Sequence, residues 1–268
     1  PGSSPRYSVD QYTDLDSDWD ADFDEALNIP KANGKKANSF EYPKLRHDGS
    51  SAVMKKHADS IVKDPANLLY SLYCPQSSHQ ENKAPEEQAA ATSRFNRFKK
   101  LIQEPNIDLT SLKKMAWNGI PYELRPISWQ LLLGYLPTNS DRRISQLSRK
   151  RKEYLDGIEQ VFNKEKEPTT WHQIEIDIPR TNPKIPLYGC ETTHRALERI
   201  LYLWAVRHPA SGYVQGISDL ATPFYQTFLS SYLDSSIVIE EFDPVVVPKD
   251  VMDAVEADTF WCLTKLLD

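Results

Sequence analysis

The stretch that decides the fold class is residues 191–208, which read ETTHRALERILYLWAVRH. Its large apolar residues recur at spacings of three and four and fall on one face of a helix: Leu197, Ile200, Leu201 and Trp204. Pro209 follows, and the residue before a proline disfavours helical backbone, so we expect the helix to end at His208. The stretch therefore predicts an amphipathic helix packed with others around an apolar core.

Helical spacing continues on both sides of this stretch. It predicts the following helices: 92–102 before Pro105, a short helix capped by Asp108 that stops at Gly119, 127–134 after Pro126, 144–162 capped by Asp141, an apolar helix after the turn 212–218 that is kinked or restarted at Pro223, and 249–268. Strand signals are confined to residues 245–247, which prolines bound on both sides. The predicted fold class is all-α.

The first 91 residues differ from the rest in amino-acid composition and in apolar spacing. They are rich in Ser, Asp, Asn, Lys and Pro without a sustained apolar period, so they cannot bury enough apolar surface to offset the entropy lost on ordering. We therefore expect a largely disordered region at 1–91 and a folded domain at 92–268.

One segment of that region, 14–27, lies mostly inside an acidic run from Asp10 to Glu25 that has no basic residue. Apolar residues recur every four positions in it: Leu15, Trp19, Phe23 and Leu27. Two interpretations stay open, a helix that folds on docking to a partner's groove and a solvated acidic tail with scattered aromatic residues.

Charge and cysteine content limit the class of protein. A formal net charge of −6 disfavours a nucleic-acid binder or a general binder of anionic membranes, which need a basic surface. Cys74, Cys190 and Cys262 are widely spaced and odd in number, which indicates free thiols in a reducing compartment. The chain has no apolar run of about 18 residues and no signal peptide core near its first residue. We expect a cytoplasmic protein without a transmembrane segment.

The sequence lacks the motifs of a self-sufficient active site. There is no glycine-rich phosphate loop with Lys and Ser or Thr, and no Cys-x-x-Cys or His-x-x-x-His spacing. The carboxylates Glu240, Glu241 and Asp243 are typical of a solvated turn. We expect no cofactor, nucleotide or metal bound by this chain itself.

Two segments place polar side chains on constrained backbone. Residues 174–181 read IEIDIPRT, where Arg180 follows a proline, and residues 212–219 read GYVQGISD, where Gln215 lies in a turn at a helix start. A cation and an amide are the two groups that a protein can lend to phosphoryl transfer in a partner, for charge neutralisation and for positioning the attacking water. Each segment alone is more typical of a salt bridge or a helix-start hydrogen bond.

Taken together, Ile174-x-x-Asp177-x-x-Arg180 and Tyr213-x-Gln215-Gly216 resemble the two signature motifs of the TBC domain of Rab GTPase-activating proteins. Gly119-Ile120-Pro121 with Arg125-x-x-x-Trp129, and the segment 256–261, resemble two further motifs of that family, and all four occur in the family's order. The resemblance runs from about residue 94 to 268 and is closest to a subgroup associated with the Golgi.

The resemblance implies a partner, a Rab-family small GTPase that binds GTP and Mg²⁺ itself. Arg180 would neutralise charge on the phosphates, and Gln215 would orient the hydrolytic water in place of the Rab's own glutamine. Asp177 would anchor the loop carrying Arg180, and Tyr213 would pack behind Gln215, which Gly216 follows. Arg125 and Trp129 would be structural, one in an internal charge pair and the other as a core aromatic.

The family's domain continues with a second helical half, so the resemblance implies a C-terminally incomplete TBC domain here. We expect the last helix to lack some of its packing partners at these apolar residues: Val251, Val255, Trp261 and Leu266. A rival hypothesis is a catalytically silent helical scaffold that binds a Rab or a Golgi partner. The presence of both Arg180 and Gln215 disfavours it, since a scaffold needs neither.

Overall fold

A computed structural model describes residues 53–71 and 85–268, so the segment 14–27 and Cys74 lie outside the described residues. These ranges are helical, and no strand occurs in them beyond two isolated bridges, Met54 with Leu233 and Asn106 with Asn139. The prediction of an all-α fold is confirmed. The α-helices are α2 (Ala58–Lys63), α3 (Leu68–Ser71), α4 (Pro85–Ile102), α5 (Leu109–Ala116), α6 (Arg125–Leu132), α7 (Arg143–Phe162), α8 (Pro168–Asp177), α9 (Glu191–Arg207), α10 (Ile217–Ser230) and α11 (Lys249–Leu267).

Short 3-10 turns connect several of these helices. They are η1 (Pro65–Asn67), η2 (Tyr122–Leu124), η3 (Ser140–Arg142), η4 (Ile178–Arg180), η5 (Pro186–Gly189), η6 (Ile239–Glu241) and η7 (Pro244–Val246). The run of valines at 245–247 therefore forms part of a 3-10 turn and the residue after it, as its flanking prolines suggest.

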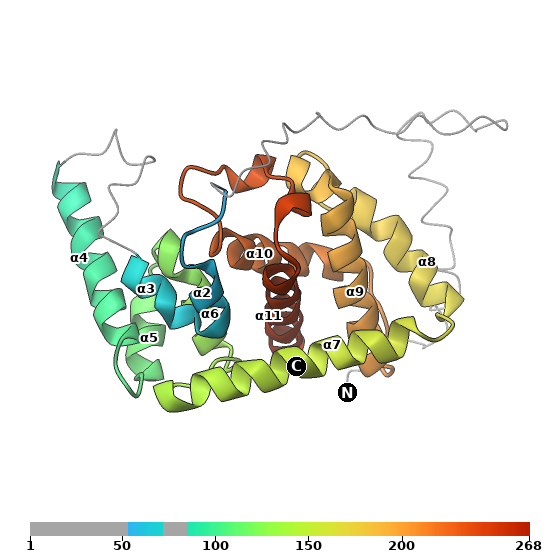
Figure 1. The fold of residues 1–268 in the computed structure, drawn as a ribbon, viewed down its shortest axis with the longest axis horizontal. Coiled ribbons are helices and arrows are strands. Elements are labelled where there is room, and N and C mark those ends of the chain that lie inside the picture. The colour runs from blue at the N-terminus through green and yellow to red at the C-terminus, as the bar shows by residue number, and fades with distance from the viewer. Residues whose placement is uncertain (1–52, 72–84) are drawn as a thin grey trace, which may run out of the picture. The chain divides into compact units, whose positions relative to one another are not determined.

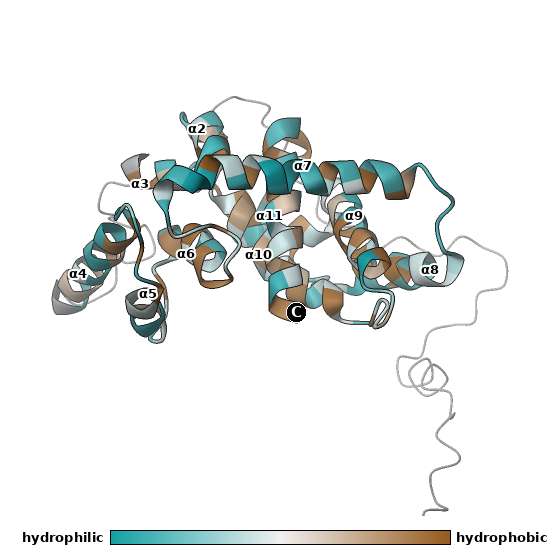
Figure 2. Cartoon of the chain, turned by 90° about the horizontal axis from the view of Figure 1, so that it is seen from below, coloured by the Kyte–Doolittle hydropathy of each residue, from teal (hydrophilic) through white to brown (hydrophobic). Residues whose placement is uncertain are grey.

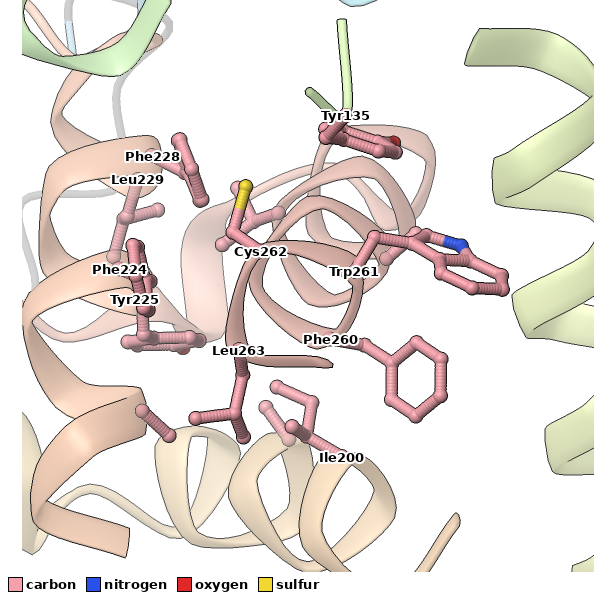
Figure 3. Close-up of a cluster of buried hydrophobic side chains, with 14 of the residues drawn as sticks. Tyr135, Ile200, Phe224, Tyr225, Phe228, Leu229, Phe260, Trp261, Cys262 and Leu263 are labelled. Carbon is pink, nitrogen blue, oxygen red and sulfur yellow. The ribbon is translucent and has the colours of Figure 1, made fainter. Parts of the chain in front are cut away.

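Helix α11 is the central element of the fold. It contacts α10, α7, α9, α2 and α6, and Figure 1 shows it nearly end-on between its neighbours, with α7 running across it. Figure 3 shows its residues 260–263 surrounded by aromatic and aliphatic side chains of α9 and α10. The expectation that this helix lacks packing partners is wrong for Val251, Val255 and Trp261, which are buried, whereas Leu266 is half exposed.

The packing of α11 depends on buried charges as well as apolar contacts. Asp258 accepts hydrogen bonds from both Nε (2.8 Å) and an η nitrogen (2.7 Å) of Arg151 on α7, and Glu256 is paired with Arg199 on α9 (2.6 Å). Tyr135 and Gln130 also donate to Asp258. Within the basic run 149–152 of α7, Arg151 therefore lies in a buried ion pair, whereas the side chain of its neighbour Lys152 is exposed.

The polar N-terminal region contributes more structure than its composition suggests. Residues 53–71 form two short helices, and Ile61, Leu68 and Leu69 are buried in the main core. Helix α4 also begins at Pro85, before the expected boundary at residue 92. The prediction of disorder is therefore wrong for 53–71, whose helices are too short to show an apolar period. It is also wrong for 85–91, which start the 18-residue helix α4 but contain no large apolar side chain.

The other predicted helices are found with small shifts. Asp108 caps α5 by accepting a hydrogen bond from the Thr110 amide (2.9 Å), as predicted. Asn139 caps η3, the turn that leads into α7, by accepting a hydrogen bond from the Asp141 amide (2.9 Å). The N-cap residue of α7 is Arg142, whose side chain forms no capping bond, so the prediction of Asp141 as the cap is wrong. Figure 2 shows a largely hydrophilic outer side on α7.

Candidate functional site

Arg180 lies on η4, the 3-10 turn that directly follows helix α8. Glu167 caps the start of α8 by accepting hydrogen bonds from the amides of Thr170 (2.6 Å) and Thr169 (3.0 Å), and these bonds lower the pKa of its carboxyl to about 2. The helix ends at Asp177, and the chain tightens into η4, because Pro179 has no amide hydrogen to continue the α-helical ladder. Arg180 is the last residue of η4 and is exposed.

Gln215 lies in the turn that opens α10. Gly212 (φ +62°) and Gly216 (φ +91°) on either side of it both adopt left-handed backbone, which glycine tolerates and other residues rarely adopt. Gly216 is also the N-cap residue of α10. The chain therefore presents Gln215 at a helix N-terminus on backbone that the two glycines define.

Asp177 joins the two elements. Its Oδ2 accepts hydrogen bonds from the Tyr213 hydroxyl, the Gly216 amide (3.1 Å) and the Ser218 hydroxyl (3.0 Å). Tyr213 and Ser218 are buried, and Asp177 itself is 8% exposed. The carboxylate was expected to anchor the loop carrying Arg180; the structure shows that its three donors come from the turn carrying Gln215 and from the first turn of α10.

The hydroxyl of Tyr213 is a donor over the whole physiological range. Burial and the adjacent Asp177 carboxylate raise the pKa of Tyr213 well above its ordinary value. The phenol therefore keeps its proton and stays bonded to the carboxylate. The hydrogen bond between Tyr213 and Asp177 holds the buried side of the turn in place, while Gln215 is exposed.

Arg180 and Gln215 are exposed, and neither forms a hydrogen bond or ion pair with any other described residue. Three exposed apolar residues lie beside them in sequence: Ile176 (40% exposed), Val214 (55%) and Leu220 (44%). A cation and an amide held on fixed backbone without internal partners are available to a second molecule. Their apolar neighbours would lose water if such a molecule docked there.

Arg125 and Trp129 lie on α6, away from this network. The Nε of Arg125 donates to the Ile120 carbonyl (3.4 Å), and its guanidinium lies over the Tyr122 ring at 5.5 Å. No carboxylate among the described residues pairs with it, so the expected internal charge pair is not formed. Trp129 is partly buried and packs edge-to-face on Phe224 of α10.

Sequence reasoning missed two hydroxyls that belong to this network. Thr181 donates to the Ser218 hydroxyl (2.8 Å) and lies near the Asp177 carbonyl (3.1 Å). The only signal in the sequence was position, because Thr181 follows Arg180 and Ser218 follows the Gln215 turn. Hydroxyls are common at the starts of helices and in turns, so position alone carried no functional meaning.

No group of three His, Cys, Asp or Glu side chains in the described ranges could hold a metal ion. No helix in the described part of the chain is long and apolar enough to cross a membrane.

Comparison with protein families and known proteins shows what this chain is similar to. The family described as Rab-GTPase-TBC domain matches residues 122–268. The human protein TBC1 domain family member 22B is 42% identical over 240 residues, which cover 88% of this chain and 47% of that protein. The GTPase-activating protein GYP1 of Saccharomyces cerevisiae is 40% identical over 99% of this chain and 46% of its own length.

A solved structure described as the Ypt/Rab-GAP domain of Gyp1p is similar to this fold. It has a TM-score of 0.63 and 51% sequence identity over 66% of this chain and 57% of that chain. The subgroup to which the motifs pointed, TBC-domain family member 22, is represented among the relatives. This chain spans about half the length of the curated relatives it matches.

Proposed function

The chain belongs to the Rab-GTPase-TBC domain family, and from that premise we propose that it is a GTPase-activating protein for a Rab-family small GTPase. One observation carries the proposal. Arg180 and Gln215 are exposed, have no described partner, and lie on two elements that the buried Asp177 ties together. Relatives that are named GTPase-activating proteins support the same function.

In this proposal Arg180 acts on the phosphates of GTP bound to the Rab. Negative charge develops on the oxygens between the β- and γ-phosphates as the terminal bond breaks, and a guanidinium placed there stabilises the transition state. An arginine without an internal carboxylate partner loses no ion pair when it enters the active site of another protein. The bonds of Asp177 and Thr181 on either side of it hold its backbone in place.

Gln215 would orient the water that attacks the γ-phosphate. An amide can accept a hydrogen bond from that water and donate one to a phosphate oxygen at the same time. The hydrogen bond from the Gly216 N–H to Asp177 fixes the backbone next to Gln215. Little conformational entropy is therefore lost when the side-chain amide of Gln215 contacts the water. In this mechanism the Rab's own glutamine is not required.

The GTPase would supply GTP and Mg²⁺, and this chain would contribute no cofactor of its own. The described surface offers no glycine-rich phosphate loop and no cluster of metal ligands. We place the protein in the cytoplasm with a peripheral association with the Golgi, as the subgroup implies. The segment 14–27 would serve as a docking site for a further partner.

The test is single-turnover hydrolysis of GTP by a panel of purified Rabs with and without this protein. We expect strong acceleration for at least one Rab, and tighter binding of that Rab when it holds GDP and a fluoride-based mimic of the phosphoryl group, because the contacts of Arg180 and Gln215 strengthen in the transition state.

Two outcomes would contradict the proposal. Tight binding of a Rab without acceleration would favour the silent scaffold. Calorimetry that detects tight binding of GTP to this protein alone would show that the nucleotide site lies on this protein and not on the GTPase.

A further inference from the structure

We propose that Asn182 and Thr222 form a positioning pair that sets the place of Arg180 relative to Gln215, and that the direction of their hydrogen bond is essential to this role. The inference rests on the proposed function and deepens it. Neither residue belongs to the two motifs, and neither is expected to touch the nucleotide. They would act through the backbone that carries Arg180.

Asn182 has unusual backbone geometry. Its φ of +47° makes it the one residue other than glycine with a positive φ in the described ranges. This left-handed conformation is unfavourable for most side chains, and asparagine is among the residues that tolerate it best. Because Asn182 lies two residues after Arg180, it determines how the chain turns away from that side chain. Such a conformation persists only where the surroundings hold it.

The surroundings are provided by α10. The Nδ2 of Asn182 donates to Oγ1 of Thr222 at 3.0 Å, across 40 positions of sequence. Asp177 and Thr181 already bond to the first turn of the same helix, through Gly216 and Ser218. Arg180 is therefore bracketed on both sides by bonds to the helix that begins immediately after Gln215.

The helix itself fixes the direction of this bond. Pro223 lies inside α10 and has no amide hydrogen, so the helix cannot supply the usual donor for the Asp219 carbonyl. The Thr222 hydroxyl donates to that carbonyl instead, at 3.0 Å. A hydroxyl has one hydrogen to donate, so Oγ1 of Thr222 can only accept from residue 182.

This direction accounts for an amide at position 182. Asparagine combines tolerance of left-handed backbone with an N–H donor, and both properties are needed here. Aspartate tolerates left-handed backbone, but its carboxylate would face Oγ1 of Thr222 as a second acceptor with no hydrogen between them. Glycine suits the backbone and leaves Thr222 without its donor. The pair thus leaves the side chain of Arg180 free while its backbone is fixed.

The experiment measures two quantities for each variant: the rate constant of GTP hydrolysis in the saturated complex with a responsive Rab, and the Kd for that Rab bound to a non-hydrolysable GTP analogue. The variants are Asn182→Gly, which keeps left-handed backbone available, and Thr222→Val, which keeps the shape of the side chain. Thr222→Ser is the matched control because it retains the hydroxyl. Melting temperature and the helical signal report on the fold.

We expect Asn182→Gly and Thr222→Val each to lower the rate constant about 10-fold, with a Kd within about twofold of the wild type, because displacement of a catalytic group affects the transition state more than the ground state. Thr222→Ser should retain most of the rate. The double variant should be little worse than either single variant, since both remove the same bond.

Several results would overturn the inference. Rates within about twofold of the wild type for both single variants would reduce the pair to a structural contact, as would losses confined to Kd or melting temperature. A Thr222→Ser variant as slow as Thr222→Val would remove the role of the hydroxyl. A wild-type protein that accelerates no Rab would defeat the proposed function and this inference together, whereas an active wild type with unaffected variants would defeat the inference alone.

Discussion

Asp258 on α11 and Asp177 at the end of α8 are both buried carboxylates, but they differ in the groups that bind them. Asp258 accepts two hydrogen bonds from the guanidinium of Arg151. Asp177 accepts only from uncharged donors, namely a phenol, an amide and a hydroxyl. Arg180, three residues away from Asp177, is left exposed and without a described partner.

The difference separates an arginine that stabilises the fold from one that is available for another molecule. Arg151 is held in a bidentate pair whose side chains are only 11% and 2% exposed, so its charge is balanced within the fold. Neutral groups donate all the hydrogen bonds described for the Asp177 carboxylate, so the nearby Arg180 is not paired with it.

Substitution of Arg180 should have the largest effect, and it should fall on activity. Arg180→Lys is expected to lose most of an acceleration that is typically about 10³ to 10⁵, or roughly 4–7 kcal/mol of barrier, because a lysine cannot reproduce the planar fork of a guanidinium. Single-turnover hydrolysis with a responsive Rab measures the loss. The melting temperature should not change, since Arg180 contacts no described partner. Hydrolysis within a few-fold of the wild type would refute the role of Arg180.

Substitution of Asp258 should instead affect stability. Asp258→Asn keeps the shape of the side chain but leaves the charge of Arg151 buried without a counter-charge, which typically costs about 3–5 kcal/mol. The free energy of unfolding in urea measures this cost, and the helical signal of the variant without urea shows whether it still folds. A loss below about 1 kcal/mol would mean that the two carboxylates differ less than their partners suggest.

Substitution of Gln215 should reduce activity by a smaller factor than that of Arg180. Against a Rab whose own glutamine is changed to alanine, the wild-type protein should still accelerate hydrolysis, and Gln215→Ala should lower that acceleration by about 10²-fold, or roughly 2.7 kcal/mol. If Gln215 only supports the start of α10, its loss would cost about 1 kcal/mol of stability and little rate. A glutamine-deficient Rab that ignores the wild-type protein would rule out the second catalytic side chain.

Lys152 provides the matched control for the buried pair. It is adjacent to Arg151 on α7, and its side chain is 73% exposed where it pairs with Asp156. Lys152→Ala should lower the free energy of unfolding by less than about 0.5 kcal/mol, because exposed ion pairs contribute little. Urea unfolding of this variant beside Asp258→Asn measures both costs on one scale. Equal costs would show that burial does not distinguish the two cations.

The sequence alone predicted those parts of the fold that depend on local chemistry. Residues 143–162 and 191–207 form helices within one residue of the predicted starts and ends, because their apolar spacing is regular over several turns. Asp108 was identified as a cap because capping involves residues only a few positions apart. Arg180 and Gln215 were noticed because proline and glycines constrain the backbone around them.

Features that depend on contacts across long separations could not be predicted. The bonds of Asp177 reach residues 36 to 41 positions away, so the link between the two motifs is invisible in the sequence. Asp258 meets Arg151 across 107 positions, so a helix with several charged residues gave no sign of being central. The short helices at 58–63 and 68–71 gain their stability from the main core, which local spacing does not report.

The central place of α11 also has a consequence for the order of folding. Its partners on α6 and α7 precede it by more than a hundred residues, as in the bond between Gln130 and Asp258 across 128 positions. Helices α6, α7 and α9 therefore emerge from the ribosome well before the helix that covers their apolar faces and neutralises Arg151 and Arg199. Native packing waits for that late segment, and until it emerges the earlier helices expose apolar surface of the kind that makes partly folded chains prone to aggregate.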